Sequence, residues 1–306
     1  MVEDVTHTVT GATGYTGRYI TELLLEQGNK VQSITGHPDR HNPFGKRVKT
    51  QQFNFEHPDL LEQALTGTDT LFNTYWIRFN RGNLTYQRAV KNTITMFKAA
   101  KAAGVRRVVH ISITNPDLES SLPYFRGKAY TEEALRRSGL SYAILRPTVL
   151  YSTKDILLNN IAWTVRKFPL VLMPGSGRCL VQPVFVEDLA QLAVEAASDN
   201  QNTEIDAVGP EVFTYKEMVK LIRGKVGARC LVLPAPKLLT YVAVEILGLF
   251  LNDVVITWDE IKGLCADLMV SKSSAPAPAK TKLSEWLDNN GSDLGLHYAS
   301  EIQRHY

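Results

Sequence analysis

Tyr124 and Lys128 are the side chains whose types and spacing point most directly to chemistry. They lie four residues apart at the start of a predicted helix, so both project from one face, one turn apart. A free phenol has a pKa near ~10, and a neighbouring ammonium stabilises its phenolate. The pair could therefore transfer a proton. The alternative is an inert pair in which Lys128 only contacts a ribose hydroxyl.

Ser112 is the third candidate of this set. It stands at the end of an apolar strand predicted over residues 105–113, and residues 114–123 lead from there to Tyr124. Ligands of parallel sheets bind at the carboxyl ends of the strands. We therefore expect Ser112, Tyr124 and Lys128 to converge at one edge of a sheet as a catalytic set.

A glycine-rich segment near the N-terminus supplies a second kind of site. Gly11, Gly14 and Gly17 follow a short β-branched strand and precede a helix predicted over residues 18–27. In such a strand-to-helix turn, the first glycine permits a tight turn of the backbone and the second lets backbone N–H groups approach a pyrophosphate. The third glycine lets the helix pack on the strand. Glycine and threonine also make ordinary turns. The strand–helix context favours a dinucleotide bound by Gly11, Thr13, Gly14, Tyr15, Thr16 and Gly17.

The end of the second strand indicates which dinucleotide. NAD is usually held there by an acidic side chain on the ribose hydroxyls, about 20 residues beyond the glycines. The sequence has instead Gly36, His37 and Arg40, and an arginine can pair with a 2′-phosphate. We therefore expect NADP rather than NAD, with Arg18 as a second candidate for the phosphate. Alternatively, Arg40 is a solvated loop residue.

Residues at the ends of the other strands are the remaining cofactor candidates. Asn54 and Phe55 are placed to flank the adenine, and Thr74, Tyr75 and Trp76 to pass under the middle of the cofactor. The full set of these expected contacts is Asn54, Phe55, Thr74, Tyr75, Trp76, Lys128, Pro147 and Val149. Aromatic side chains at strand ends are often part of the hydrophobic core. Here they could instead surround an apolar or planar small-molecule substrate, and the candidates are Tyr75, Trp76, Phe79, Tyr151 and Trp163.

Strands and helices alternate through the first half of the chain. Strands are predicted over residues 5–9, 30–35, 48–53, 70–74, 105–113 and 141–145, and helices over 58–65, 81–104 and 129–137. This pattern predicts an α/β fold with a doubly wound parallel (Rossmann) sheet over residues 1–150. A smaller substrate-binding region, interleaved with that domain, is expected over 151–270, and a linker with a helical tail over 271–306.

The composition restricts the partners. The 306 residues carry 34 Lys and Arg against 31 Asp and Glu, without a long basic run, so nucleic acid is not expected. No histidine spacing suggests a metal site. The N-terminus carries acids and no apolar run, and we expect a cytoplasmic location. The segment Leu238 to Ile256 is apolar but interrupted by charges, and is expected to form an amphipathic helix pair that packs on the core or docks on a protein or a membrane surface.

Several of these motifs together resemble the short-chain dehydrogenases/reductases of the extended and atypical kind. Within that family they are similar to the group of the nucleotide-binding accessory subunit of respiratory complex I. The residues that carry the resemblance are 10–17, 108–112, 123–128, 145–148 and 184–190. The resemblance implies that Tyr124 is the proton donor, that Lys128 holds the ribose and lowers the tyrosine pKa, and that Ser112 polarises a carbonyl.

Two functions follow from this reading. The first is an NADP-dependent oxidoreductase, or an epimerase or dehydratase, that acts on a carbonyl or alcohol. The second is a non-catalytic subunit or redox sensor that holds NADPH and docks on a partner, since atypical members often lose the tyrosine and the complex I relative turns over no substrate. Retention of Ser112, Tyr124 and Lys128 favours the enzyme.

Overall fold

The computed structural model describes residues 5–305 and divides into two compact units. The first contains residues 5–147 and 186–207, and the second contains residues 148–185 and 208–305. Residues 1–4 and 306, the outer ends of the predicted regions 1–150 and 271–306, lie outside the described part.

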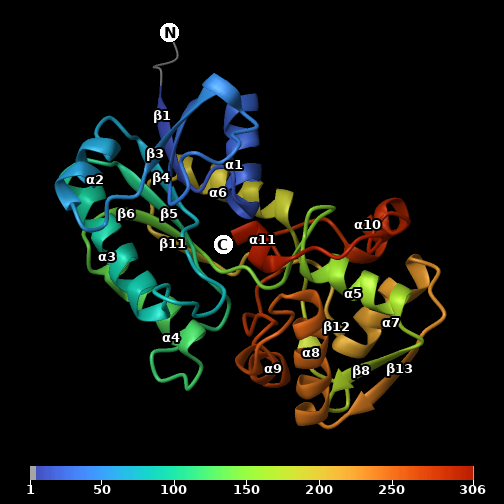
Figure 1. Cartoon of the computed structure of the whole chain (residues 1–306). Helices are drawn as coiled ribbons and strands as arrows, with labels where there is room; N and C mark the ends of the chain where they lie inside the picture. Colours follow the sequence, from blue (N-terminus) through green and yellow to red (C-terminus); the bar gives the residue numbers. More distant parts are fainter. Residues whose placement is uncertain (1–4, 306) are drawn as a thin grey trace. The chain divides into compact units, whose positions relative to one another are not determined.

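A seven-stranded parallel sheet is the centre of the first unit, which confirms the doubly wound α/β fold (Figure 1). Its strands, in spatial order, are β11 (Thr203–Ile205), β6 (Ser141–Leu145), β5 (Arg107–Ile111), β4 (Thr70–Asn73), β1 (Thr6–Thr10), β2 (Lys30–Thr35) and β3 (Val48–Gln52). The chain reverses its direction of winding between β1 and β4, and ligands of doubly wound sheets bind at such a switch point. The short strand β11 was not predicted; β6 is therefore not the last strand of the sheet.

Helices cover both faces of this sheet (Figure 1). α1 (Tyr15–Glu26) and α6 (Val186–Ser198) pack together on one face, and α2 (Pro58–Leu65), α3 (Tyr86–Ala102) and α4 (Pro123–Arg136) lie on the other. α3 begins at Tyr86 and not at residue 81, because the Thr85 side chain accepts a hydrogen bond from the Arg88 N–H and caps the helix there. α4 begins at Pro123, so Tyr124 and Lys128 lie in its first two turns.

The second unit is built from shorter elements around its own apolar core. The helices are α5 (Leu157–Lys167), α7 (Tyr215–Lys225), α8 (Lys237–Leu251), α9 (Trp258–Cys265), α10 (Leu283–Asn290) and α11 (Glu301–His305). The strands form three pairs: β7 (Leu150–Tyr151) with β10 (Val184–Phe185), β9 (Leu180–Val181) with β12 (Phe213–Thr214), and β8 (Leu170–Pro174) with β13 (Leu231–Ala235). Among the described residues, no helix is both long enough and apolar enough to cross a membrane.

One segment of the second unit differs from expectation. Leu238 to Ile256 is not a helix pair: α8 is a single helix that ends where Asn252 adopts a left-handed conformation with φ of 50°. Within the expected helical tail, Leu283, Trp286 and Leu287 of α10 are buried in the core of this unit.

Candidate functional site

The glycine segment forms a tight turn between β1 and α1. Gly11 has φ of +65°, a conformation that favours glycine, and its carbonyl accepts a hydrogen bond from the Gly14 N–H at 2.8 Å. Gly14 is the N-cap of α1. A Cβ on Gly14 would lie 3.1 Å from the Gly11 oxygen, and a Cβ on Gly17 would lie only 2.2 Å from it. Gly17 is therefore required for packing, whereas Gly14 leaves backbone accessible at the helix N-terminus.

Lys128 lies at the carboxyl end of β5, almost fully buried. Its Nζ donates a hydrogen bond to the Ile111 carbonyl at 2.7 Å and lies 4.5 Å from the centre of the Trp76 ring. Burial lowers the pKa of Lys128 to about 7, although Glu132 acts in the opposite direction. The Trp76 ring also favours the charged form. Lys128 can therefore exchange a proton near neutral pH.

Two polar atoms next to this lysine lack a partner among the described residues. Ser112, the neighbour of Ile111, is 3% exposed, and its Oγ has no hydrogen-bond partner; neither has Nε1 of Trp76. A buried hydroxyl or indole N–H without a partner costs on the order of 1–3 kcal/mol. Both atoms are therefore candidates for binding a polar group of a ligand.

Tyr124 reaches the same place through aromatic contacts. Its ring lies edge-on to Trp76, at 5.8 Å between centroids, and edge-on to Tyr86, at 5.9 Å. Since Trp76 also covers Nζ of Lys128, one indole contacts both members of the predicted pair. The structure thus brings Tyr124 and Lys128 together around Trp76, and Ser112 follows Ile111, the β5 residue whose carbonyl accepts from Lys128.

A buried polar chain beneath this site was not anticipated from the sequence. Nδ2 of Asn73 is 3.1 Å from Nδ1 of His110, and Nε2 of His110 is 3.1 Å from the Thr131 hydroxyl, which donates to the Lys128 carbonyl. Burial and the charge of Lys128 hold the pKa of His110 well below its usual range, so this imidazole is neutral. The polar residue His110, between the apolar residues Val109 and Ile111 of β5, was the available signal.

The end of β2 carries positive charge on its loop. His37 and Arg40 are both exposed, and burial followed by the charge of Arg40 lowers the pKa of His37. A Cβ on Gly36 would make only ordinary contact, 3.8 Å from Phe53. Arg18, the second phosphate candidate, is paired with Glu22 at 2.8 Å.

Phe55, expected beside the adenine, and Tyr75, expected under the middle of the cofactor, belong to one aromatic cluster. Phe55 stacks on Phe53 at 4.8 Å, and Tyr75 contacts both rings. The Tyr75 hydroxyl accepts a hydrogen bond from Asn92, and burial raises its pKa. Asn54 donates to the Gln52 carbonyl. Phe55 and Tyr75 thus present one rigid aromatic surface.

Thr74 and Pro147 have backbone roles at strand ends. The Thr74 N–H donates to the Thr10 hydroxyl at 2.7 Å, and the Thr74 hydroxyl donates to the Thr10 carbonyl, which ties the end of β4 to the glycine turn. The Pro147 carbonyl accepts from the Thr114 N–H. Val149 packs on the core of the second unit, and its carbonyl accepts from the Val184 N–H.

Three aromatic residues expected around the substrate have other positions. Tyr151 is fully buried in the core of the second unit and donates to the Thr281 carbonyl, so its assignment to a substrate pocket is wrong. Trp163 packs against Phe168 and Tyr298 in the same unit. Phe79 is 6% exposed and packs as a core residue.

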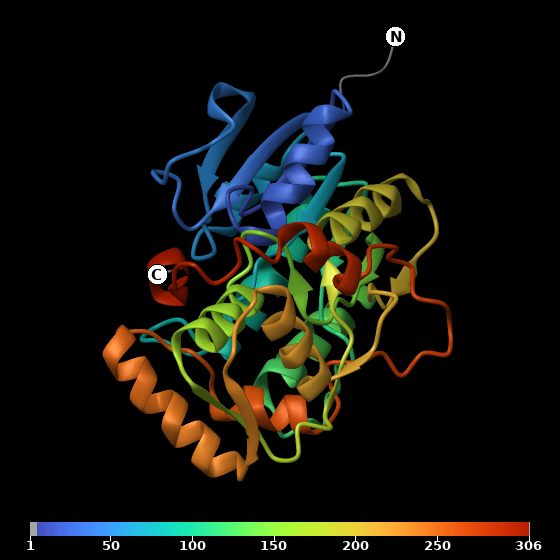
Figure 2. The ribbon, with the colours of Figure 1, turned by 90° about the vertical axis from the view of Figure 1, so that its right-hand side faces the viewer.

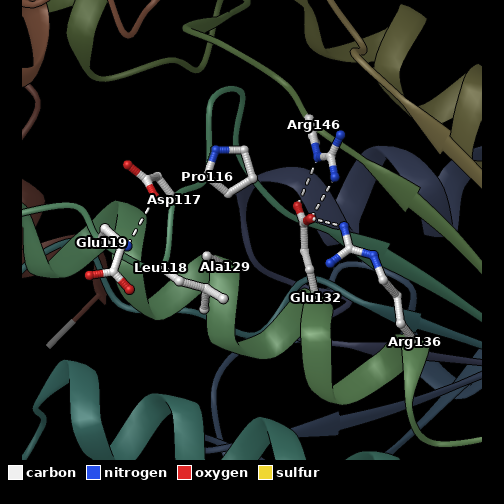
Figure 3. Close-up of a pocket in the computed structure, with 8 residues that line it drawn as sticks. All are labelled: Pro116, Asp117, Leu118, Glu119, Ala129, Glu132, Arg136 and Arg146. Atoms are coloured by element: carbon white, nitrogen blue, oxygen red, sulfur yellow. Dashed lines mark hydrogen bonds and ion pairs between the residues drawn. The ribbon is translucent and has the colours of Figure 1, made fainter.

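An open pocket of about 490 Å³ lies over α4 (Figure 3). It is lined by Pro116, Asp117, Leu118, Glu119, Ala129, Glu132, Arg136 and Arg146. The buried Glu132 carboxylate accepts from Arg136 at 2.8 Å and from Arg146 at 2.6 Å, and both arginines also bind Glu204. The arginine charges are thus already paired, and this network fastens α4 to β6 and β11.

A dinucleotide fits the donors that the first unit presents. The N-terminus of α1 can receive phosphates because Gly14 adds no side chain there. At the other end of the binding edge, Lys128 and the unpartnered Ser112 hydroxyl can bind ribose or carbonyl oxygens. The aromatic surface of Phe55 and Tyr75 lies next to the end of β4.

Comparison with known proteins agrees with this geometry. Residues 11–162 match the model of the NAD(P)H-binding family. Subunit 9 of the mitochondrial NADH dehydrogenase 1 alpha subcomplex of Arabidopsis thaliana is 26% identical over 233 residues, which cover 72% of this chain and 58% of that protein. The chain therefore matches less than two thirds of that relative's length.

Solved structures share the fold at lower identity. The NADPH-dependent quinone oxidoreductase of Escherichia coli, complexed with NADPH, is 20% identical with a TM-score of 0.74, over 92% of this chain and 98% of that one. The triphenylmethane reductase of Citrobacter sp., complexed with NADP(H), is 18% identical with a TM-score of 0.69, over 93% and 99%. Residues 11–162 therefore form an NAD(P)H-binding domain, and these similarities are consistent with the atypical short-chain dehydrogenase/reductase type.

Proposed function

We propose that this protein is an NADPH-dependent oxidoreductase in which Tyr124 passes a proton to or from a carbonyl or alcohol oxygen. The observation that carries the proposal is the position of Lys128, buried at the end of β5 beside the unpartnered Ser112 hydroxyl and under the indole that also contacts Tyr124. When bound, the nicotinamide would supply or accept a hydride.

The side chains of this site have separate roles in the proposal. The Ser112 hydroxyl donates a hydrogen bond to the substrate oxygen. Without a bound substrate, this buried hydroxyl has no hydrogen-bond partner among the described residues. Lys128 binds the ribose and, in its charged form, stabilises a phenolate on Tyr124. Trp76, Tyr86 and Tyr124 present aromatic surface, which suits a planar or apolar carbonyl compound such as a quinone or an aromatic aldehyde.

The cofactor preference is proposed from the loop after β2. Arg40 provides positive charge there, and β2 ends without an acidic side chain that would bind ribose hydroxyls. The two compared structures contain NADPH or NADP(H). We expect calorimetric titration to give tighter binding of NADPH than of NADH, and Arg40→Ala to remove most of this difference. Arg137→Ala, at the exposed arginine that follows α4, is the control. A wild-type preference for NADH would contradict the assignment.

The catalytic proposal is tested with Tyr124→Phe. NADPH oxidation is followed by absorbance with a panel of quinones and aromatic aldehydes. For a substrate that the wild type reduces, the variant should keep NADPH binding and lose roughly two to four decades of rate, because the ring stays and the transferable proton is removed. Tyr130→Phe, at an exposed tyrosine of the same helix, should leave the rate unchanged. A Tyr124→Phe variant as fast as wild type would refute the role of Tyr124.

A holding function without turnover is the second candidate. It is favoured by the hydrogen bond and indole contact that already engage the Lys128 ammonium, and by the similarity to a complex I subunit. Slow exchange of bound NADPH, together with no activity on the panel, would favour this candidate over the enzyme.

A further inference from the structure

The outer face of α8 is the largest run of exposed apolar side chains in the second unit. Six of them are 45–85% exposed: Leu238, Leu239, Val242, Ile246, Leu249 and Phe250. At 100° per residue they occupy an arc of about 120°, the width with which an ordinary surface helix faces its core. The opposite side, which includes Thr240 and Gly248, is buried. α8 therefore has a second apolar face, which no described residue of its unit covers. Figure 2 shows α8 (orange) at the edge of that unit.

The strand before α8 also carries exposed apolar side chains. Leu231 and Leu233 of β13 are 62% and 45% exposed and lie on one face of the strand, with Leu170 of β8 paired beside Leu231. β13 leads into α8 through Pro236 alone. An exposed apolar surface of this extent marks a binding surface rather than chance exposure.

Positive charge gathers at the N-terminal end of α8. A Cβ on Gly175 would contact Lys237 at 3.9 Å, and one on Gly177 would contact Lys216 at 3.1 Å, so both lysines border the turn that also carries Arg178. Within residues 5–305, none of these three cations has an acidic partner. Glu245 is the one charged side chain of the sequence between Leu238 and Leu251, and it lies at the edge of the arc, where it can reach water.

We infer that α8 lies in the interface of a lipid membrane with anionic headgroups, with its apolar arc among the acyl chains and Lys216, Lys237 and Arg178 at the headgroups. Helices with a large apolar face and adjacent cations bind in this way without crossing the bilayer. A second copy of the chain in parallel contact through α8 would bring like charges together, whereas an antiparallel pair would keep them apart, so the oligomeric state is measured beside vesicle binding. The inference does not depend on the proposed reaction.

Vesicle flotation tests it with the full-length protein. The wild type should bind vesicles of mixed phosphatidylcholine and phosphatidylglycerol. The double substitution Leu249→Ser, Phe250→Ser should weaken binding by about tenfold or more, because two large side chains no longer leave water. Lys216→Gln with Lys237→Gln should weaken it by roughly fivefold per cation, and added salt should do the same. Leu60→Ser with Leu84→Ser, two exposed leucines of the first unit, is the matched control and should bind as wild type does.

Other outcomes of these measurements would contradict the membrane-binding inference. Equal binding by wild type and by the Leu249, Phe250 variant would overturn the inference, as would absence of binding by the wild type. A wild-type dimer in sedimentation that the same variant abolishes, without vesicle binding, would assign the face to a second copy. Thermal unfolding of each variant shows whether it is folded.

Discussion

Gly17→Ala should destabilise the protein through one defined contact. The new Cβ would lie 2.2 Å from the Gly11 oxygen, 2.9 Å from the Gly11 carbonyl carbon and 3.3 Å from the Thr10 oxygen. Cβ atoms rarely approach a heavy atom to within about 3 Å, so α1 must move away from β1 by the better part of an ångström. Buried Ile20 and Leu24 on that helix would move with it.

The magnitude follows from two opposing effects. Overpacking of this kind costs typically about 1–3 kcal/mol. Alanine gains up to about 1 kcal/mol over glycine within a helix, and less in the first turn, where Gly17 lies. We therefore expect a net loss of about 2 kcal/mol in the free energy of unfolding, a large fraction of the roughly 5–15 kcal/mol of a typical domain.

Urea unfolding followed by circular dichroism measures this loss. With a slope of about 3 kcal/mol per molar urea, the midpoint should fall by about 0.7 M. Gly36→Ala is the matched control, since its Cβ would meet Phe53 at an ordinary 3.8 Å, and it should change stability by less than about 0.5 kcal/mol. Equal midpoints for Gly17→Ala and Gly36→Ala would show that α1 does not pack on the glycine turn as described.

Three further outcomes are expected. Burial lowers the pKa of Lys128 from 10.5 to about 7, so between these pH values the folded state binds fewer protons than the unfolded state. The free energy of unfolding should therefore rise with pH across this window. The substitution Lys128→Met should remove this rise. A pH profile shared by both proteins would contradict this. Glu132→Gln leaves Arg136 and Arg146 without their buried carboxylate partner and should lower the free energy of unfolding, measured in urea, by about 3 kcal/mol. Glu133→Gln, at a more exposed ion pair, should lower it by less than about 1 kcal/mol. Equal losses for the two variants would refute the buried network. Trp76→Phe removes the indole over Lys128 and should change NADPH affinity more than Trp258→Phe does in the second unit, as calorimetry would show; equal affinities would separate Trp76 from the site.

The sequence predicted the sheet well because its strands are apolar, short and separated by amphipathic helices. β2 and α2 have the predicted bounds. β11 escaped prediction because three residues, Thr203–Ile205, carry no periodicity and pair with β6 only through the tertiary fold. The start of α3 was misplaced because the Arg81–Leu84 turn and the Thr85 cap compete with helical periodicity.

Within the candidate site, spacing predicted the components but not the contacts. Tyr124 and Lys128 share a helix face by periodicity, and Ser112 follows from its strand. That Trp76 covers the ammonium, and that His110 connects Asn73 to Thr131 below it, depends on the packing of β4, β5 and α4. Tyr151 was a candidate pocket residue because aromatic side chains at strand ends occur both in pockets and in hydrophobic cores. Its full burial in the second unit shows that it belongs to the core.

Native mass spectrometry tests the central claim, a dinucleotide held at the Gly11–Gly17 turn, most directly. The wild type with added NADPH should carry one dinucleotide per chain, and Gly14→Val should carry none while remaining folded by circular dichroism, because a branched side chain at this position occupies the approach to the pyrophosphate. A Gly14→Val protein that retains NADPH as the wild type does, or a folded wild type that never binds it, would contradict the account.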